Sequence, residues 1–84
     1  MTIDYKDIKL SYQKYGNGKE VIVILPGWGE TRNTFLEMIN ILMIDYTVYI
    51  IDYPGFGDTL FPNHNLNMYD YSEMIIKFLN DLNI

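Results

Sequence analysis

The first fifteen residues alternate between apolar and polar side chains. Ile8, Leu10 and Tyr12 fall on one face of an extended chain, and the polar residues between them fall on the other. A period of two residues is typical of a strand with one solvated face. We expect residues 3–5 to pair with this strand, which predicts a β-hairpin over residues 1–15.

Two continuous apolar runs follow, from Val21 to Leu25 and from Thr47 to Ile51. Short runs rich in β-branched residues predict strands that are covered on both faces, as in a parallel sheet. The segment between them predicts a helix, which Thr31 or Asn33 can cap. The apolar stripe of this helix consists of Phe35, Met38, Ile39, Leu42 and Met43. Because parallel strands need a crossover connection, we expect residues 21–57 to form a βαβ core.

The remaining residues predict a loop and a second helix. Residues 58–67 are mostly polar and predict an exposed loop, after which Asn67 can cap a helix over residues 67–83 with Asp70 in its first turn. The apolar stripe of this helix consists of Tyr71, Met74, Ile75, Phe78, Leu79 and Leu82. The predicted order places residues 1–84 in the α/β class, as one segment with a hairpin and a β-α-β-α unit of a mostly parallel sheet.

The charge pattern excludes several classes of partner. The net charge is −5 and the six Lys and Arg residues are scattered, whereas a nucleic-acid binder needs them clustered. The same distribution disfavours binding to an anionic membrane surface. The most apolar region, residues 35–53, is interrupted by carboxylates and predicts no membrane span. Because the sequence has no cysteine, we expect no disulfide. The N-terminal residues lack the basic start and apolar run of a signal peptide, so we expect a cytoplasmic location.

Each apolar strand ends in a glycine-rich loop, residues 26–30 and residues 52–58. Ligands of parallel α/β sheets bind outside the carboxyl ends of the strands, where both loops would lie. In the first loop, backbone N–H groups can point into a cleft and stabilise an oxyanion, or the loop is a tight turn without chemistry. In the second, Asp52 can accept backbone N–H bonds and Pro54-Gly55 suits a type II turn, which favours a structural role over that of a catalytic acid.

Together the two loops resemble those of the α/β-hydrolase superfamily. The first loop reads Pro26-Gly27-Trp28-Gly29 where the family usually has His-Gly-x-Gly. The second reads Asp52-Tyr53-Pro54-Gly55-Phe56-Gly57 where the family has Asp-x-Pro-Gly-x-Gly. The resemblance covers nearly the whole chain and most suggests serine hydrolases with small lids, such as carboxylesterases and C–C bond hydrolases. Pro26 in place of His is the departure within the first motif.

The resemblance implies a role for each loop residue. The backbone N–H of Trp28 would be an oxyanion-hole donor, its side chain would line the acyl pocket, and Phe56 would lie near the mouth of the cleft. The implied substrate-binding residues are Gly27, Trp28, Gly29 and Phe56, and the implied structural turn consists of Asp52, Pro54, Gly55 and Gly57.

No nucleophile is predicted within these residues. The family carries its nucleophile on a Gly-x-Ser-x-Gly elbow on the next strand, followed by an acid and a His. Ser11 falls on the early strand and Ser72 in the last helix, and neither is flanked by glycines. His64 lies in a polar loop and is interpreted as a surface residue. Because there is no second His and no Cys, we expect no metal site, and no cofactor is implied.

Three hypotheses remain open. In the first, the chain is the N-terminal part of a hydrolase acting on an ester, thioester, amide or C–C bond, and it is inactive alone because the triad is incomplete. In the second, it is a non-catalytic binding or assembly module. In the third, it is a fragment without an independent role. If the chain is completed, its partner would be a small-molecule acyl substrate. Without a further strand, Val21 to Leu25 would be an open edge that pairs either with a second copy or with a missing C-terminal half.

Overall fold

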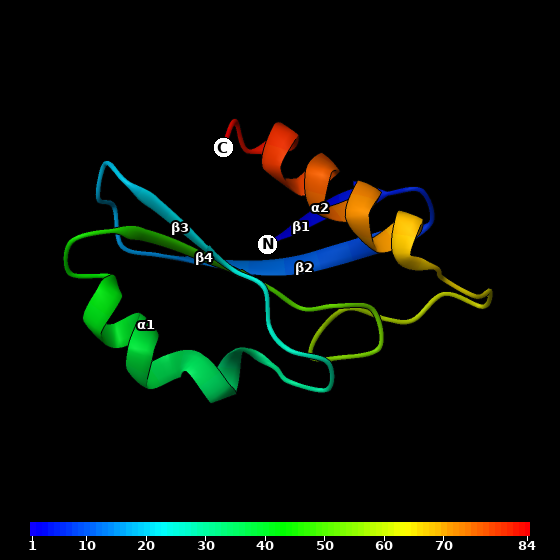
Figure 1. The fold of residues 1–84 in the computed structure, drawn as a ribbon, viewed down its shortest axis with the longest axis horizontal. Coiled ribbons are helices and arrows are strands. Elements are labelled where there is room, and N and C mark those ends of the chain that lie inside the picture. The colour runs from blue at the N-terminus through cyan, green and yellow to red at the C-terminus, as the bar shows by residue number, and fades with distance from the viewer.

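Four strands of the chain form one sheet in the order β1-β2-β4-β3 (Figure 1). The structure, a computed structural model, describes all residues from 1 to 84. Its elements are β1 (Thr2–Tyr5), β2 (Ile8–Tyr15), β3 (Val21–Ile24), the 3-10 turn η1 (Arg32–Phe35), α1 (Leu36–Leu42), β4 (Thr47–Ile51) and α2 (Met68–Asp81).

The sheet is mixed. Strands β1 and β2 form an antiparallel hairpin in which Ile3 lies opposite Leu10. Strand β2 is also antiparallel to β4, whereas β3 and β4 are parallel, with Ile22 opposite Val48. The α/β class is confirmed, and within these residues β3 and β4 are the parallel pair. The helical crossover between these two strands is what allows them to run in the same direction.

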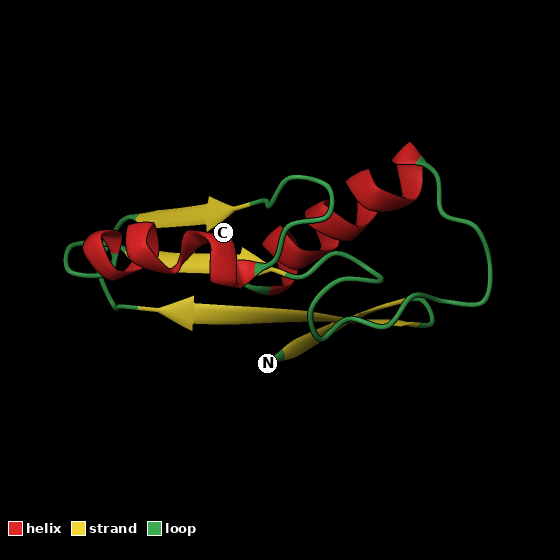
Figure 2. Cartoon of the chain, turned by 90° about the horizontal axis from the view of Figure 1, so that it is seen from below, coloured by secondary structure: helices red, strands yellow, loops and turns green.

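The two helices cover opposite faces of the sheet, as Figures 1 and 2 show. Successive side chains of a strand point to opposite faces, so Ile50 and Ile51 of β4 belong to different cores. The larger core lies between the hairpin side of the sheet and α2 and consists of Ile3, Tyr5, Ile8, Leu10, Tyr12, Ile51, Met74 and Phe78. The smaller core lies under α1 and consists of Ile24, Ile39, Val48 and Ile50.

The cap and the buried side of α2 agree with the sequence pattern. The Asn67 side chain accepts a hydrogen bond from the Asp70 backbone N–H at 3.0 Å, and the Asp70 carboxylate accepts one from the Asn67 backbone N–H at 2.9 Å. These reciprocal bonds form a capping box. Met74 and Phe78 are fully buried, and the Phe78 ring meets Tyr12 edge to face at 5.3 Å between centroids. No helix has the length and apolarity needed to cross a membrane.

The first helix differs from the prediction. The chain enters it through η1, and the α-helix itself is only seven residues long. Neither Thr31 nor Asn33 caps it through a side-chain hydrogen bond. Of the predicted stripe, Ile39 is buried, whereas Met38 and Met43 are exposed. The reason is that α1 packs only on the β3–β4 end of the sheet, where four buried residues form the small core.

Strand β3 is less covered than its apolar sequence suggests. It lies at the edge of the sheet and ends at Ile24, one residue before the predicted end. Only Ile24 is buried, and Val21 is 43% exposed. Coverage on both faces was the expectation, and it is wrong for most of this strand because no neighbour lies beyond it. Its outer row of backbone groups is therefore open to pairing.

Candidate functional site

The two glycine loops leave the sheet at the same end, because β3 and β4 are parallel neighbours (Figure 1). The first loop comprises residues 26–31 and the second comprises residues 52–59. This is the end at which ligands of parallel α/β sheets bind. The topology therefore brings together two segments that lie more than twenty residues apart in the sequence.

A tight turn presents the Trp28 backbone at the tip of the first loop. The Gly27 carbonyl accepts a hydrogen bond from the Glu30 backbone N–H at 3.0 Å, and Gly29 has φ +85°. A bond from the fourth residue to the first, with positive φ at the third, is the pattern of a type II turn. The Glu30 carboxylate also accepts the Gly27 N–H at 3.0 Å. The Trp28 N–H makes no hydrogen bond within the chain and is free to bind another group.

The Trp28 side chain lies beside aromatic rings from two other segments, the second loop and α2. Its centroid is 5.3 Å from that of Phe56 in the second loop and 5.7 Å from that of Tyr71 in α2, both edge to face. Tyr71 in turn meets Tyr53 at 6.0 Å. Trp28 remains 71% exposed. Aromatic edges arranged in this way provide a wide apolar surface that is open on one side.

A cavity of about 580 Å³ lies beside these rings. Its lining consists of Pro26, Trp28, Tyr53, Leu66, Asn67, Met68, Tyr71, Ser72 and Ile75. None of these side chains is charged at neutral pH. Burial raises the pKa of the Tyr53 hydroxyl, and burial together with the charge of Asp70 raises the pKa of the Tyr71 hydroxyl. The cavity therefore favours an uncharged, apolar group.

The structure brings together only some of the predicted site residues. Trp28 lines the cavity and contacts Phe56, whereas Gly27, Gly29 and Phe56 are not part of the lining. Sequence reasoning missed most of the lining from α2 and the segment before it. Tyr71 and Ile75 belong to the predicted apolar stripe of this helix, and spacing alone does not distinguish a stripe that faces a cavity from one that faces the core.

Asp52 and Gly57 form the base of the second loop. Asp52 is 2% exposed, and its carboxylate accepts the Asp58 backbone N–H at 3.0 Å. Gly57 has φ +54°, and a Cβ there would lie 2.4 Å from the Asp52 carboxylate carbon. At the tip, the Phe56 N–H donates to the Tyr53 carbonyl at 2.9 Å and Gly55 has φ +88°. This geometry matches a type II turn.

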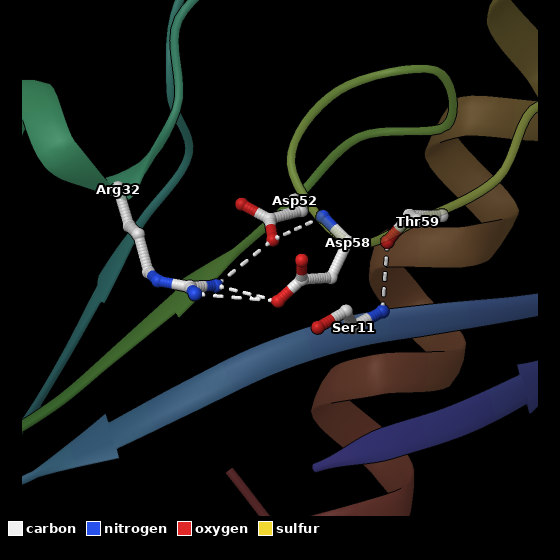
Figure 3. A network of polar contacts seen from close by, with 5 residues as sticks. All are labelled: Ser11, Arg32, Asp52, Asp58 and Thr59. Carbon is white, nitrogen blue, oxygen red and sulfur yellow. Dashed lines mark hydrogen bonds and ion pairs between the residues drawn. The ribbon is translucent and has the colours of Figure 1, made fainter.

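Arg32 and Thr59 connect this loop to its surroundings, and neither was singled out from the sequence (Figure 3). The Arg32 guanidinium donates to Asp52 and to Asp58, each at 3.2 Å. The Thr59 hydroxyl oxygen accepts the Ser11 backbone N–H at 2.8 Å. Thr59 is 2% exposed, so the prediction of an exposed loop is wrong at this position. A buried acceptor was needed there because Ser11 would otherwise hold an unpaired N–H.

Ser11, Ser72 and His64, the other residues considered for catalysis, do not lie together. Ser11 is buried under Thr59, whereas Ser72 lines the cavity but makes no hydrogen bond to a His or a carboxylate. His64 is a surface residue whose Nε2 lies 3.1 Å from the Asp7 carboxylate and whose Nδ1 lies 3.2 Å from the Asn65 carbonyl. No three His, Cys, Asp or Glu side chains are grouped so that they could hold a metal ion.

Comparison with solved structures shows which fold the chain has. An alpha/beta hydrolase fold protein from Burkholderia ambifaria matches all of the chain with a TM-score of 0.87 at 13% identity, and the chain covers 31% of it. An esterase from Exiguobacterium antarcticum matches 92% with a TM-score of 0.83 at 23% identity, and the chain covers 29% of it. The fold is that of the N-terminal portion of an α/β-hydrolase, as the two loop motifs implied.

Two curated relatives carry one and the same name, pimeloyl-[acyl-carrier protein] methyl ester esterase. The protein from Proteus mirabilis is 37% identical over 49 residues, which is 58% of this chain. The protein from Vibrio parahaemolyticus is 28% identical over 68 residues, which is 81% of this chain. The matches span only 19% and 26% of the relatives. No family model matches the chain.

Proposed function

We propose that residues 1–84 supply the oxyanion-hole loop and part of the acyl pocket of an α/β-hydrolase that cleaves an ester, thioester, amide or C–C bond. The observation that carries the proposal is the free Trp28 N–H at the carboxyl end of β3. A backbone donor held in a turn costs no reorganisation when charge develops on a carbonyl oxygen, which is why such donors accelerate acyl transfer. The cavity beside Trp28 would take the acyl chain.

The comparisons favour the ester among the four bonds. Both curated relatives are named as methyl ester esterases, and one of the solved structures is an esterase. The uncharged lining of the cavity supports an apolar acyl group next to the scissile carbonyl. The substrate of this chain is accordingly proposed to be a small-molecule ester with an apolar acyl part.

These residues alone are proposed to be inactive. Nucleophilic catalysis needs a hydroxyl or thiol activated by a base, and the two serines here have no such base within hydrogen-bond reach. The nucleophile, the acid and the His of the triad would come from sequence other than residues 1–84. The cytoplasmic location expected from the sequence stays a prediction.

The experiment incubates the pure chain with p-nitrophenyl butyrate and, separately, with a serine-directed fluorophosphonate. We expect no turnover above the rate in buffer and no labelling. Variants Ser72→Ala and Ser11→Ala serve as matched controls, since Ser72 lines the cavity and Ser11 is buried. Turnover with stoichiometric labelling that is lost only in Ser72→Ala would contradict the proposal that this chain is inactive alone.

A second candidate function is that of a binding or assembly module, and the open edge of β3 favours it. Val21 and Leu25 are 43% and 45% exposed, and β3 pairs only with β4. An apolar edge of this kind pairs readily with another strand. Sedimentation of the chain from dilute to concentrated solution tests this function. A concentration-dependent dimer that Val23→Pro abolishes would support it, and a monomer throughout would count against it.

A further inference from the structure

We propose that Arg32 is a positioning residue, which fixes the first glycine loop against the second and thereby places the Trp28 backbone N–H. The last step of this proposal rests on the proposed function, because it assumes that the Trp28 N–H is the oxyanion donor. The coupling between the two loops does not depend on that assumption. It follows from the contacts of one guanidinium and from the way in which its partners are held.

The guanidinium of Arg32 spans the space between the loops (Figure 3). Arg32 is the first residue of η1 and lies four residues after Trp28. Its Nη1 donates to Asp52 Oδ2 and to Asp58 Oδ2, and its Nη2 also donates to Asp58 Oδ2, all at 3.2 Å. These are the only hydrogen bonds that join residues 26–35 to residues 52–59. The planar fork of Arg suits two carboxylates at once, which the point charge of Lys does not.

The partners of Arg32 belong to a loop that is fixed to β2 at both of its ends. The Asp52 backbone N–H donates to the Ser11 carbonyl at 2.9 Å, and the Ser11 N–H donates to the Thr59 hydroxyl oxygen at 2.8 Å. One residue of the sheet therefore holds the beginning and the end of the second loop. Because Arg32 bonds to Asp52 and Asp58, it holds the first loop in a fixed place relative to the second.

Apart from the buried Pro26 at its start, the first loop has little else to hold it. Its hydrogen bonds run from Glu30 to Gly27 and from Thr34 to Thr31, within the loop and its own helix. No residue of η1 is buried. The Trp28 ring contacts Phe56 and Tyr71 but is itself mostly exposed. A loop with few buried contacts opens easily unless specific bonds hold it. In the first loop, the bonds of Arg32 have this role.

The charges of Asp52 and Asp58 determine what happens when Arg32 is removed. Asp52 Oδ1 is buried without a hydrogen-bond partner, so the stabilisation of this carboxylate rests on the groups at Oδ2, which are Arg32 and the Asp58 N–H. Asp58 brings a second carboxylate to the same guanidinium. Without Arg32, two like charges would face each other with no cation between them. Both carboxylates lie in the second loop, so the removal of Arg32 also takes away the only hydrogen bonds between the two loops, and we expect the first loop to move away from the second.

The test uses NMR on the full 84-residue chain, with Trp28 as the single tryptophan reporter. In Arg32→Gln we expect the cross-relaxation between the Trp28 and Phe56 rings to fall at least about twofold. Exchange of the Asp58 amide should become faster by about tenfold or more, because a charge-assisted network around its acceptor is lost. In Arg32→Lys, which keeps the charge but not the fork, both effects should be intermediate.

A matched control and a second variant keep the test decisive. Lys77→Gln removes one exposed cation on α2, paired with Asp81, and should leave both signals unchanged. If Arg32→Gln does not fold, Asp58→Asn leaves the buried Asp52 pair intact and should weaken the ring contact in the same direction. Unchanged Trp28–Phe56 cross-relaxation in a folded Arg32→Gln or in Asp58→Asn overturns the proposal. This readout involves no catalysis, so its failure is distinct from any failure of the proposed function.

Discussion

The two glycine loops follow neighbouring strands and look alike in sequence, yet the structure holds them in different ways. The second loop is fixed by the buried Asp52 carboxylate and by Thr59, which bonds to β2. The first loop is mostly exposed and has a single turn closed by Glu30. The backbone N–H groups of Gly55, Phe56, Asp58 and Thr59 in the second loop are all hydrogen-bonded, whereas the Trp28 N–H in the first loop is unpaired.

This difference separates the two roles that a loop at a sheet end can have. A catalytic donor must be unpaired before the reaction, and an exposed unpaired donor is tolerated because water can bind it. A supporting loop needs the opposite, since a buried carboxylate is stable only when it is paired and hydrogen-bonded. The predictions that follow test this contrast at Asp52 and at one glycine of each loop, and then turn to His64, which lies beyond the second loop.

The largest effect is expected for Asp52→Ala. This substitution removes the acceptor of the Arg32 guanidinium and of the Asp58 N–H from a buried site. We expect the free energy of unfolding to fall by about 3 kcal/mol, because two hydrogen bonds to a charged group are lost, each worth about 1.5 kcal/mol or more. Urea unfolding followed by far-UV circular dichroism measures it. Asp45→Ala is the control, since Asp45 is exposed, and equal losses for the two variants would contradict the supporting role.

Alanine at a glycine of each loop gives the next contrast. Gly57 and Gly29 both have positive φ, so alanine is strained at either by about 1 kcal/mol. At Gly57 the new Cβ would also lie 2.4 Å from the Asp52 carboxylate, whereas at Gly29 nothing lies within 4 Å. We expect Gly57→Ala to cost about 2–3 kcal/mol and Gly29→Ala about 1 kcal/mol in unfolding free energy. The same cost at both positions would remove the distinction between the loops.

The smallest effect is expected at His64, in the continuation of the second loop. The carboxylate of Asp7 raises the pKa of His64 above 6.5, helped by the charge of Asp70, and His64 in turn lowers the pKa of Asp7 below 3.8. The raised His pKa contributes stability that is present below pH 6.5 and is lost as the pH rises through the folded-state pKa. The lowered Asp pKa contributes stability that is lost as the pH falls below 3.8.

The pair should therefore stabilise the chain between these two limits. Urea midpoints of the wild type and of His64→Gln, measured from pH 3 to pH 9, should differ slightly near pH 5 and converge as the pH rises through the folded-state pKa of His64. Both partners are largely exposed, so the difference should shrink in high salt. A difference that grows toward pH 9 would contradict the ion pair.

Sequence reasoning recovered the order of the elements, the parallel pair and the α2 cap because these depend on local patterns. Alternation predicts the hairpin, and the Asn67 and Asp70 side chains are a local cap signal. The coverage of β3 and α1 was predicted less well. An apolar residue such as Val21 or Met38 is buried only if another element lies over it, and that depends on tertiary neighbours.

In the candidate site, too, the local features were predicted and the tertiary contacts were not. The turn at Trp28 was predicted because glycine positions mark turns in the sequence itself. The contact of Arg32 with Asp52 and Asp58 was missed because these residues lie twenty or more positions apart and nothing local links them. The cavity lining was missed for a related reason, since a helix stripe that faces a cavity has the same spacing as one that faces the core.

The most direct test of the central claim removes the Trp28 N–H and leaves the turn. Proline suits the second position of a type II turn, so Trp28→Pro should keep the loop while deleting its donor, and Trp28→Phe keeps both the N–H and an aromatic ring. The measurement is the hydrolysis of p-nitrophenyl butyrate by the Vibrio parahaemolyticus esterase with its matching N-terminal segment replaced by residues 1–84. We predict that Trp28→Pro lowers kcat by about 10²–10³-fold and Trp28→Phe by less than about tenfold. An active chimera in which Trp28→Pro and Trp28→Phe have equal kcat values would contradict the account.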